Sequence, residues 1–321
     1  MTTALAITDL TKDFPVGKRL FGPPRGVVHA VRPVTLDVAE GETLGIVGES
    51  GCGKSTLARM LVGLLPPTAG TIKINGQPLD NADPALFGRK IQYVFQDPIS
   101  SLNPRKTIRQ IMEAPLRHLH NMPAADRARR INQIFAAVNL REEFLDRYPH
   151  EFSGGQAQRI GIARALAADA RIVILDEPVS ALDVSVQAQV LNLLADLKGQ
   201  FGLTYLFISH DLAVVEAVSD RVAVLYFGSV VEVGPATAVF SQPRHPYTKL
   251  LAESAPVVGR PLAAPEGRET ELPDPLNPPT GCAFRERCSK ASAICAQIAP
   301  VMTEVADGVS VACHHPLTGP A

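Results

Sequence analysis

Short apolar stretches separated by turn-forming or polar residues occupy the first ~95 residues of the chain. Stretches of four or five apolar-rich residues between such breaks are typical of β-strands. The pattern predicts five strands, at Ala4–Ile7, Val34–Val38, Thr43–Val47, Thr71–Ile74 and Ile91–Phe95.

Helical spacing of apolar residues appears in two further regions. Residues 55–65 place four apolar side chains on one face and stop before Pro66-Pro67, which predicts a short helix carrying Leu57, Met60, Leu61 and Leu64. Residues 107–146 show the same spacing, with the charges of residues 126–130 opposite the apolar face of Ile131, Ile134, Phe135 and Val138. We expect this second region to be a helical insert.

The second half of the chain alternates buried strands with helices. Apolar runs at 171–175, 204–208 and 221–224 are long enough for strands, and residues 184–197 have a helical pattern. Strands that alternate with helices indicate a parallel α/β sheet.

Composition changes beyond Phe240. Seven prolines fall between Pro256 and Pro279, and four of the five cysteines lie from Cys282 onward. Because proline restricts the backbone and lacks an N–H donor, we expect an extended, irregular linker that leads into a separate C-terminal extension.

Composition also limits the class of protein. The chain has 321 residues and a formal net charge of −1, so no overall basic field would attract nucleic acid or an anionic membrane. No apolar run reaches the roughly 18 residues that span a bilayer, and the N-terminus lacks the pattern of a signal peptide. We therefore expect a cytoplasmic globular protein whose five cysteines do not form structural disulfides.

A phosphate-binding loop follows the predicted strand at 43–47. Its pattern GxxxxGK[ST] is met by Gly48-Glu49-Ser50-Gly51-Cys52-Gly53-Lys54-Ser55-Thr56. The glycines let backbone N–H groups converge on phosphate oxygens, Lys54 supplies a cation for the β and γ phosphates, and the Ser55 hydroxyl can bind Mg²⁺. The loop predicts a nucleoside triphosphate site, although the pattern alone also arises by chance.

Two acidic residues end the predicted strand at 171–175. Asp176 would hold Mg²⁺ through its water shell, and Glu177 would polarise the water that attacks the γ-phosphate. Taken alone, the pair could be the solvated acids of a turn. With the phosphate-binding loop upstream, we interpret it as the second nucleotide-site motif, a Walker B strand.

A third motif, Phe152-Ser153-Gly154-Gly155-Gln156, precedes the helical pattern of 157–168. A serine and glycine N–H groups at a helix N-terminus can bind an anion, although an isolated run of this kind is more often a helix cap. The run resembles the signature of ATP-binding cassette (ABC) proteins. In that family the signature contacts the nucleotide held by the opposite subunit, so the resemblance implies a head-to-tail dimer with two ATP molecules.

Smaller matches follow the order of the same family. Gln96 resembles the glutamine that touches Mg²⁺ and the attacking water, and His210 resembles the histidine that contacts the γ-phosphate and holds Glu177. The run 180–183 resembles the D-loop at the dimer seam and ends at Asp183. Phe14 is the candidate for stacking on adenine. Each residue also has an ordinary structural interpretation as a surface, capping or core residue.

Other runs narrow the resemblance. Those at 95–98, 101–105, 180–187, 245–248 and 277–282 are similar to the ATPases of dipeptide and oligopeptide importers, and the chain resembles the F-type subunit more than its partner. The resemblance covers essentially the whole chain. It implies a P-loop NTPase fold at residues 1–240, with a RecA-like core, an antiparallel β subdomain and a helical subdomain at about 98–160, followed by a Pro/Cys-rich extension at 241–321.

The resemblance also implies partners. They are a second ATPase subunit in a heterodimer, two membrane-spanning permease subunits and an extracytoplasmic solute-binding protein, with no nucleic acid. The chain would be a peripheral subunit on the cytoplasmic face of the inner membrane.

Alternatives to peptide import stay open at this point. The chain could be a soluble cassette protein that acts on ribosomes or DNA, a catalytically silent partner in a mixed dimer, or an importer subunit for nickel chelates or glutathione. A single cassette with a short insert argues against the ribosomal and DNA-repair classes.

The four cysteines of the extension leave three alternatives. Cys282, Cys288, Cys295 and Cys313 have gaps of five, six and seventeen residues, which are not zinc-knuckle spacings. They could hold an iron–sulfur cluster of the [4Fe-4S] type, which the resemblance favours, or a structural zinc, or remain reduced thiols. His314 and His315 add further candidate ligands.

Overall fold

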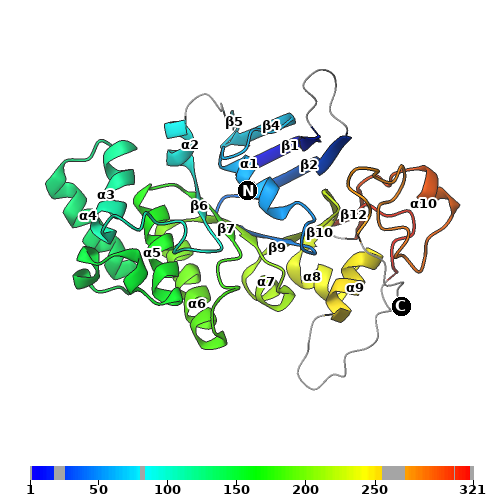
Figure 1. Cartoon of the computed structure of the whole chain (residues 1–321). Helices are drawn as coiled ribbons and strands as arrows, with labels where there is room; N and C mark the ends of the chain where they lie inside the picture. The colour runs from blue at the N-terminus through cyan, green and yellow to red at the C-terminus, as the bar shows by residue number, and fades with distance from the viewer. Residues whose placement is uncertain (1, 18–25, 80–83, 255–271, 307, 319–321) are drawn as a thin grey trace.

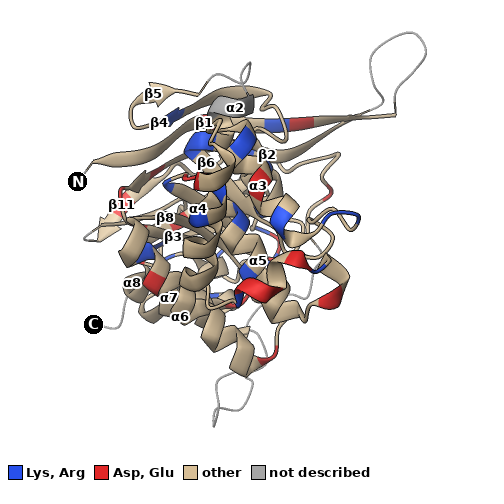
Figure 2. Ribbon diagram, turned by 90° about the vertical axis from the view of Figure 1, so that its left-hand side faces the viewer, with Lys and Arg blue, Asp and Glu red and all other residues tan. Residues whose placement is uncertain are grey.

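The computed structural model describes residues 2–17, 26–79, 84–254, 272–306 and 308–318. Two β-sheets and a set of helices build this part of the chain (Figure 1). In the described part, no helix has the length and apolar character needed to cross a membrane. Lysine and arginine positions are interspersed with acidic ones along the ribbon (Figure 2), in keeping with the balanced charge of the sequence.

The larger sheet has the strand order β11-β12-β10-β9-β3-β8-β7-β6. The five strands from β9 to the edge strand β6 run parallel: β3 (Thr43–Val47), β6 (Ile91–Val94), β7 (Ile172–Asp176), β8 (Thr204–Ile208) and β9 (Arg221–Tyr226). Every residue of β3, β7 and β8 is buried, as expected for a parallel sheet covered on both faces. The prediction of a parallel α/β sheet is confirmed.

The smaller sheet is antiparallel, with the order β2-β1-β4-β5. Its strands are β1 (Thr3–Val16), β2 (Gly26–Ala39), β4 (Ala69–Ile74) and β5 (Gln77–Pro78). Leu5, Leu36 and Ile72 of this sheet share one apolar core with Leu57 of helix α1 (Lys54–Leu61). This sheet is the antiparallel β subdomain that the resemblance implies.

Helices α3 (Ile108–His118), α4 (Ala124–Ala137) and α5 (Gly154–Ala167) form a layer at one end of the molecule (Figure 1). The 3₁₀ turns Glu142–Asp146 and Pro149–Glu151 join α4 to α5. Thr107 caps α3 by accepting a hydrogen bond from the Gln110 N–H. Helices α3 and α4 fall within the helical pattern predicted at 107–146, and α5 corresponds to the helical pattern at 157–168.

Some elements differ from the expectation. Helix α1 stops at Leu61 rather than Leu65, and Gly63, two residues later, has a left-handed φ of 72°. Helix α6 (Val184–Phe201) runs four residues beyond the predicted Leu197, to a left-handed C-cap at Gly202. Short helices for which the pattern gave no signal are α2 (Pro84–Lys90), α7 (Leu212–Val218), α8 (Ala236–Ser241), α9 (Pro246–Ser254) and α10 (Ala293–Gln297).

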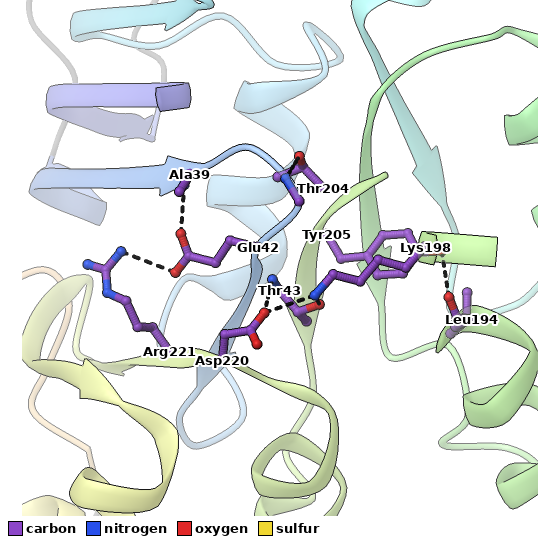
Figure 3. A network of polar contacts seen from close by, with 10 residues as sticks. Ala39, Glu42, Thr43, Leu194, Lys198, Thr204, Tyr205, Asp220 and Arg221 are labelled. Atoms are coloured by element: carbon purple, nitrogen blue, oxygen red, sulfur yellow. Dashed lines mark hydrogen bonds and ion pairs between the residues drawn. The ribbon is translucent and has the colours of Figure 1, made fainter. Parts of the chain in front are cut away.

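A polar network fixes the amino ends of the parallel strands (Figure 3). The buried Glu42 carboxylate accepts the Ala39 N–H at 2.6 Å and pairs with Arg221 at 3.1 Å. Asp220 Oδ2 accepts the Thr43 N–H at 2.7 Å and pairs with Lys198 of α6 at 2.9 Å. The starts of β3 and β9 are therefore tied together, at the edge of the sheet opposite to the phosphate-binding loop.

The C-terminal segment continues the central sheet. Strand β12 (Val309–Val311) pairs with β10 (Ser229–Pro235), and β11 (Thr303–Ala306) pairs with β12. The segment lies at the end of the molecule opposite to the α3–α4 layer (Figure 1). The proline-rich linker predicted from Pro256 lies, as far as residue 271, outside the described residues.

Candidate functional site

The phosphate-binding loop connects β3 to α1 and depends on its glycines. Gly48, Gly51 and Gly53 have φ values of 157°, 81° and 106°. A Cβ at Gly48 would lie 2.2 Å from the Leu225 carbonyl oxygen, and one at Gly53 would lie 2.5 Å from that of Ala30. Both the backbone conformation and the close approach of neighbouring strands therefore require glycine here.

Lys54 is buried inside this loop. Its ammonium donates hydrogen bonds to the backbone carbonyls of Gly48, at 2.6 Å, and Glu49, at 2.9 Å. The nearby Cys52 thiol is also buried, and burial raises its pKa, so Cys52 acts as a small apolar residue in the loop. The loop thus curls around a cation whose bonds to carbonyls can be exchanged for bonds to phosphate.

Asp176 is the last residue of β7 and lies beside the phosphate-binding loop. The carboxylate is buried and accepts hydrogen bonds from the Tyr93 hydroxyl and, at 3.3 Å, from the Ser55 hydroxyl. Burial and the bond to Asp176 raise the pKa of Tyr93, so Tyr93 stays a donor. A carboxylate and a hydroxyl side by side are the oxygen ligands that Mg²⁺ prefers, and they fit the ion expected from the sequence.

Glu177 lies at the centre of the exposed part of the site. Its backbone is left-handed, with φ 48°, and its N–H donates to the Ile208 carbonyl at 2.8 Å. One carboxylate oxygen accepts from Gln96 Nε2 at 2.9 Å, and the other lies 3.1 Å from His210 Nδ1. The unusual backbone directs the carboxylate to a position between Gln96 and His210.

A cavity of about 480 Å³ lies between the phosphate-binding loop and the residues around Glu177. The structure therefore brings the four predicted catalytic residues around one space, which is lined by Ala30, Ser50, Gly51, Gly53, Lys54, Ser55, Thr56, Gln96, Glu177 and His210. Phe14 is not among these lining residues. Its ring is 37% exposed on β1, with the Lys12 ammonium 5.2 Å from the ring centroid.

The predicted signature lies outside this cavity. Ser153 caps α5 by accepting the Gln156 N–H at 3.4 Å, and the Gln156 side chain accepts the Ser153 N–H at 3.1 Å. A Cβ at Gly155 would lie 2.5 Å from Val186 Cγ1 of α6, so the signature packs against the segment that follows Asp183. Ser153 and Asp183 are both exposed. No signature residue is therefore among those that line the cavity.

Sequence reasoning missed two contacts of Glu49. The Arg287 guanidinium pairs with both carboxylate oxygens of Glu49, and the Tyr247 hydroxyl accepts the Glu49 N–H at 2.9 Å. Tyr247 belongs to the run 245–248 that the sequence singled out, but no pattern in the sequence pointed to Arg287.

Three of the four C-terminal cysteines have a raised pKa. Burial raises the pKa of Cys282, Cys288 and Cys313, the last to about 11, and the charges of neighbouring thiolates add to each increase. However, no three His, Cys, Asp or Glu side chains in the described ranges are arranged to hold a metal ion. Cys313 Sγ accepts the His315 N–H at 3.4 Å. The expected iron–sulfur cluster on Cys282, Cys288, Cys295 and Cys313 is therefore not supported, and neither is zinc.

Comparison with known families agrees with this geometry. The family described as "ABC transporter" matches residues 31–180, and the family described as "Oligopeptide/dipeptide transporter, C-terminal region" matches residues 231–295.

Individual proteins match over nearly the whole chain. The oligopeptide transport ATP-binding protein AppF of Bacillus subtilis is 48% identical over 320 residues, which cover 97% of each chain. The dipeptide transport ATP-binding protein DppF of Haemophilus influenzae is 48% identical over 98% of this chain and 97% of its own. The protein of the same name from Escherichia coli is 48% identical over 96% of this chain and 93% of its own.

Solved structures share the fold. A dimeric bacterial ABC transporter cassette has a TM-score of 0.64 and 30% identity, covering 72% of this chain and 98% of its own. The cbiO1 protein of Clostridium perfringens, part of an ABC transporter complex, has a TM-score of 0.64 and 26% identity, covering 75% of this chain and 92% of its own.

Proposed function

The chain belongs to the ABC transporter family, and from this premise we propose that it is the ATP-hydrolysing subunit of an importer for dipeptides or oligopeptides. The observation that carries the ATPase part is the convergence of Lys54, Gln96, Glu177 and His210 on one cavity. The peptide part is supported by relatives named as dipeptide and oligopeptide transport ATP-binding proteins.

Lys54 and the backbone of the phosphate-binding loop would bind the triphosphate. On binding, the Lys54 ammonium leaves the carbonyls of Gly48 and Glu49 and turns to the β and γ phosphates. Ser55 and Asp176 would hold Mg²⁺, which supplies charge neutralisation on the phosphate oxygens. The short distance between the Ser55 and Asp176 oxygens, 3.3 Å, supports this pairing.

Glu177 would accept a proton from the water that attacks the γ-phosphate. Gln96 and His210 hold the two oxygens of its carboxylate, so the base is oriented before the substrate arrives. His210 is also exposed enough to reach the γ-phosphate, with 61% of its side chain accessible. In this proposal, hydrolysis depends mainly on positioning and on charge neutralisation.

A second subunit would complete the site. Ser153, Gly154, Gly155 and Gln156 begin a helix, where N–H groups and the helix dipole favour an anion. Because they lie outside the cavity of their own subunit, we propose that they contact the ATP bound by a partner ATPase in a head-to-tail pair. Asp183 would lie at the same seam.

The membrane partners would be two permease subunits, served by an extracytoplasmic solute-binding protein. A surface cavity of about 370 Å³ between the phosphate-binding core and the helical layer is a suitable docking place, since its lining includes Leu64, Phe87, Phe95 and Arg164. Leu64 is 60% exposed. In this arrangement the chain is a peripheral subunit at the cytoplasmic face, and closure of the ATPase pair is transmitted to the permeases.

The test is peptide uptake by vesicles that contain the chain, its partner ATPase and the permeases, supplied with the solute-binding protein. We expect ATP-dependent uptake of short peptides, which is lost when Glu177 is replaced by glutamine in both this chain and the equivalent position of its partner. Uptake that does not depend on ATP, or copurification with ribosomal RNA instead of integral membrane proteins, would contradict the proposal.

A further inference from the structure

The C-terminal segment reaches the phosphate-binding loop across 238 positions of sequence. Two guanidinium nitrogens of Arg287 donate to the two carboxylate oxygens of Glu49, each at 2.8 Å. This forked geometry fixes the orientation of both groups, and the bond to Glu49 raises the pKa of Arg287. The Arg287 and Glu49 side chains are only 15% and 28% exposed, so solvent screens the pair less than it screens a surface ion pair.

A second contact holds the backbone of the same residue. The Glu49 N–H donates to the hydroxyl of Tyr247, which is fully buried on α9. Helix α9 is itself anchored, because the buried Glu232 carboxylate accepts the N–H groups of Arg244 and His245 at 2.7 and 2.8 Å. Glu49 is thus held at its side chain and at its backbone by two different parts of the C-terminal half.

An aromatic cluster fixes Arg287 in place. The Phe284 ring is 3% exposed and packs 5.3 Å from the Tyr226 ring and 5.4 Å from the Tyr247 ring, measured between centroids. The Arg287 guanidinium lies 5.7 Å from the Phe284 centroid. The Arg287 N–H donates to the Phe284 carbonyl at 3.1 Å, so one turn carries both residues.

The charge of Glu49 is expected to affect nucleotide binding. Glu49 places a negative charge in a loop that receives a polyanion, and Arg287 neutralises that charge. The Glu49 carbonyl is also one of the two that hold Lys54 before nucleotide binds. Displacement of Glu49 would therefore change the net charge at the loop and the position of the Lys54 ammonium.

We infer that the C-terminal segment sets the affinity of the site for nucleoside triphosphate, with Arg287 as a positioning residue that acts through Glu49. The inference rests on the proposed ATPase function. It assigns to the segment a role within the nucleotide site of its own subunit.

The test begins with Arg287→Gln, which leaves the Glu49 carboxylate unpaired. We expect the Kd for Mg-ATP, measured with a fluorescent analogue, to rise about five- to tenfold, and the loss to appear in KM rather than in kcat. Arg285→Gln is the matched control, since Arg285 lies in the same turn but bonds to the Ala296 carbonyl. It should leave the Kd unchanged, and thermal melting shows whether each variant is folded.

A rescue variant separates charge from structure. Adding Glu49→Gln to Arg287→Gln removes the unpaired charge, so we expect most of the lost affinity to return. The inference is overturned if Arg287→Gln binds as wild type does, or if the double variant binds as weakly as the single one. If Arg287→Gln does not fold, Arg287→Met takes its place; it keeps a long side chain without the charge, and an unchanged Kd there would equally overturn the inference. A wild-type chain without affinity for ATP would instead refute the proposed function.

Discussion

The His210 imidazole lies 3.1 Å from a carboxylate oxygen of Glu177, across a gap of more than 30 residues in sequence. The topology of the sheet explains the contact. Glu177 follows β7 and His210 comes two residues after β8, and these strands are parallel neighbours, so their carboxyl ends meet at one edge. Gln96 follows β6, the neighbour of β7 on the other side, and completes the arrangement.

Replacing Glu177 with glutamine tests the base. The substitution keeps the shape of the side chain but removes the proton acceptor, so kcat for ATP hydrolysis should fall by at least about a hundredfold. The Kd for ATP should change little, because Lys54 and the loop backbone remain. Phosphate release and equilibrium binding measure the two quantities. Glu216→Gln, on the exposed face of α7, is the control and should hydrolyse ATP as wild type does.

Replacing Gly155 with alanine tests the packing of the predicted signature. The new Cβ would lie 2.5 Å from Val186 Cγ1, and the β-branched valine cannot easily turn away. We expect a loss of about 1–3 kcal/mol in the free energy of unfolding, measured in urea. Adding Val186→Ala should restore part of it.

Gly199→Ala is the contrasting control. Gly199 lies in α6, and a Cβ at this position would have open space around it, with no neighbouring atom within 4 Å. Alanine should therefore stabilise the helix by about 0.5–1 kcal/mol. Equal stability of the Gly155 variant and wild type would show that the contact with Val186 is not tight.

The stability of the fold should depend on the protonation of His245. Burial lowers the pKa of His245 to about 3, and its Nδ1 accepts the Tyr247 N–H at 3.0 Å, so the folded state needs the neutral ring. Since the unfolded pKa is about 6.5, this contribution is complete above pH 6.5 and is lost as the pH falls towards 3. Between pH 7.5 and 5.5 the free energy of unfolding should drop by about 1 kcal/mol from this group.

His245→Asn isolates that contribution. Asparagine offers an acceptor for the Tyr247 N–H but does not titrate. The buried Glu232, whose pKa is raised by burial, works in the opposite direction and is present in both proteins, so it cancels. Urea unfolding at the two pH values should show a smaller drop for His245→Asn than for wild type. Identical drops would contradict the assignment.

Sequence patterns predicted the elements that depend on local chemistry. The strands at 43–47 and 204–208 have the same bounds in the structure, because each is an uninterrupted buried run between polar residues. The glycine pattern predicted the phosphate-binding loop because its backbone takes conformations that other residues rarely adopt. The order of the motifs along the chain was enough to assign Lys54, Gln96, Glu177 and His210 to one site.

Long-range contacts could not be predicted in the same way. The pair between Arg287 and Glu49 depends on where the C-terminal segment folds back, and nothing near Arg287 in the sequence marks it as a partner of the loop. The cysteine spacing likewise left several arrangements open. In the described part of the chain, the four cysteines expected to bind an iron–sulfur cluster do not form a metal-binding group. The strands β11 and β12 are too short to stand out as a pattern.

Equilibrium binding of Mg-ATP to the purified chain shows whether the phosphate-binding loop holds a nucleotide. We expect saturable binding that Lys54→Ala weakens by about a hundredfold, since the lysine would make charge-assisted bonds to two phosphates. Lys73→Ala, at an exposed position of β4, should bind as wild type does. Absence of ATP binding by the wild-type chain, or equal affinity in the Lys54 variant, would show that this loop is not a nucleotide site.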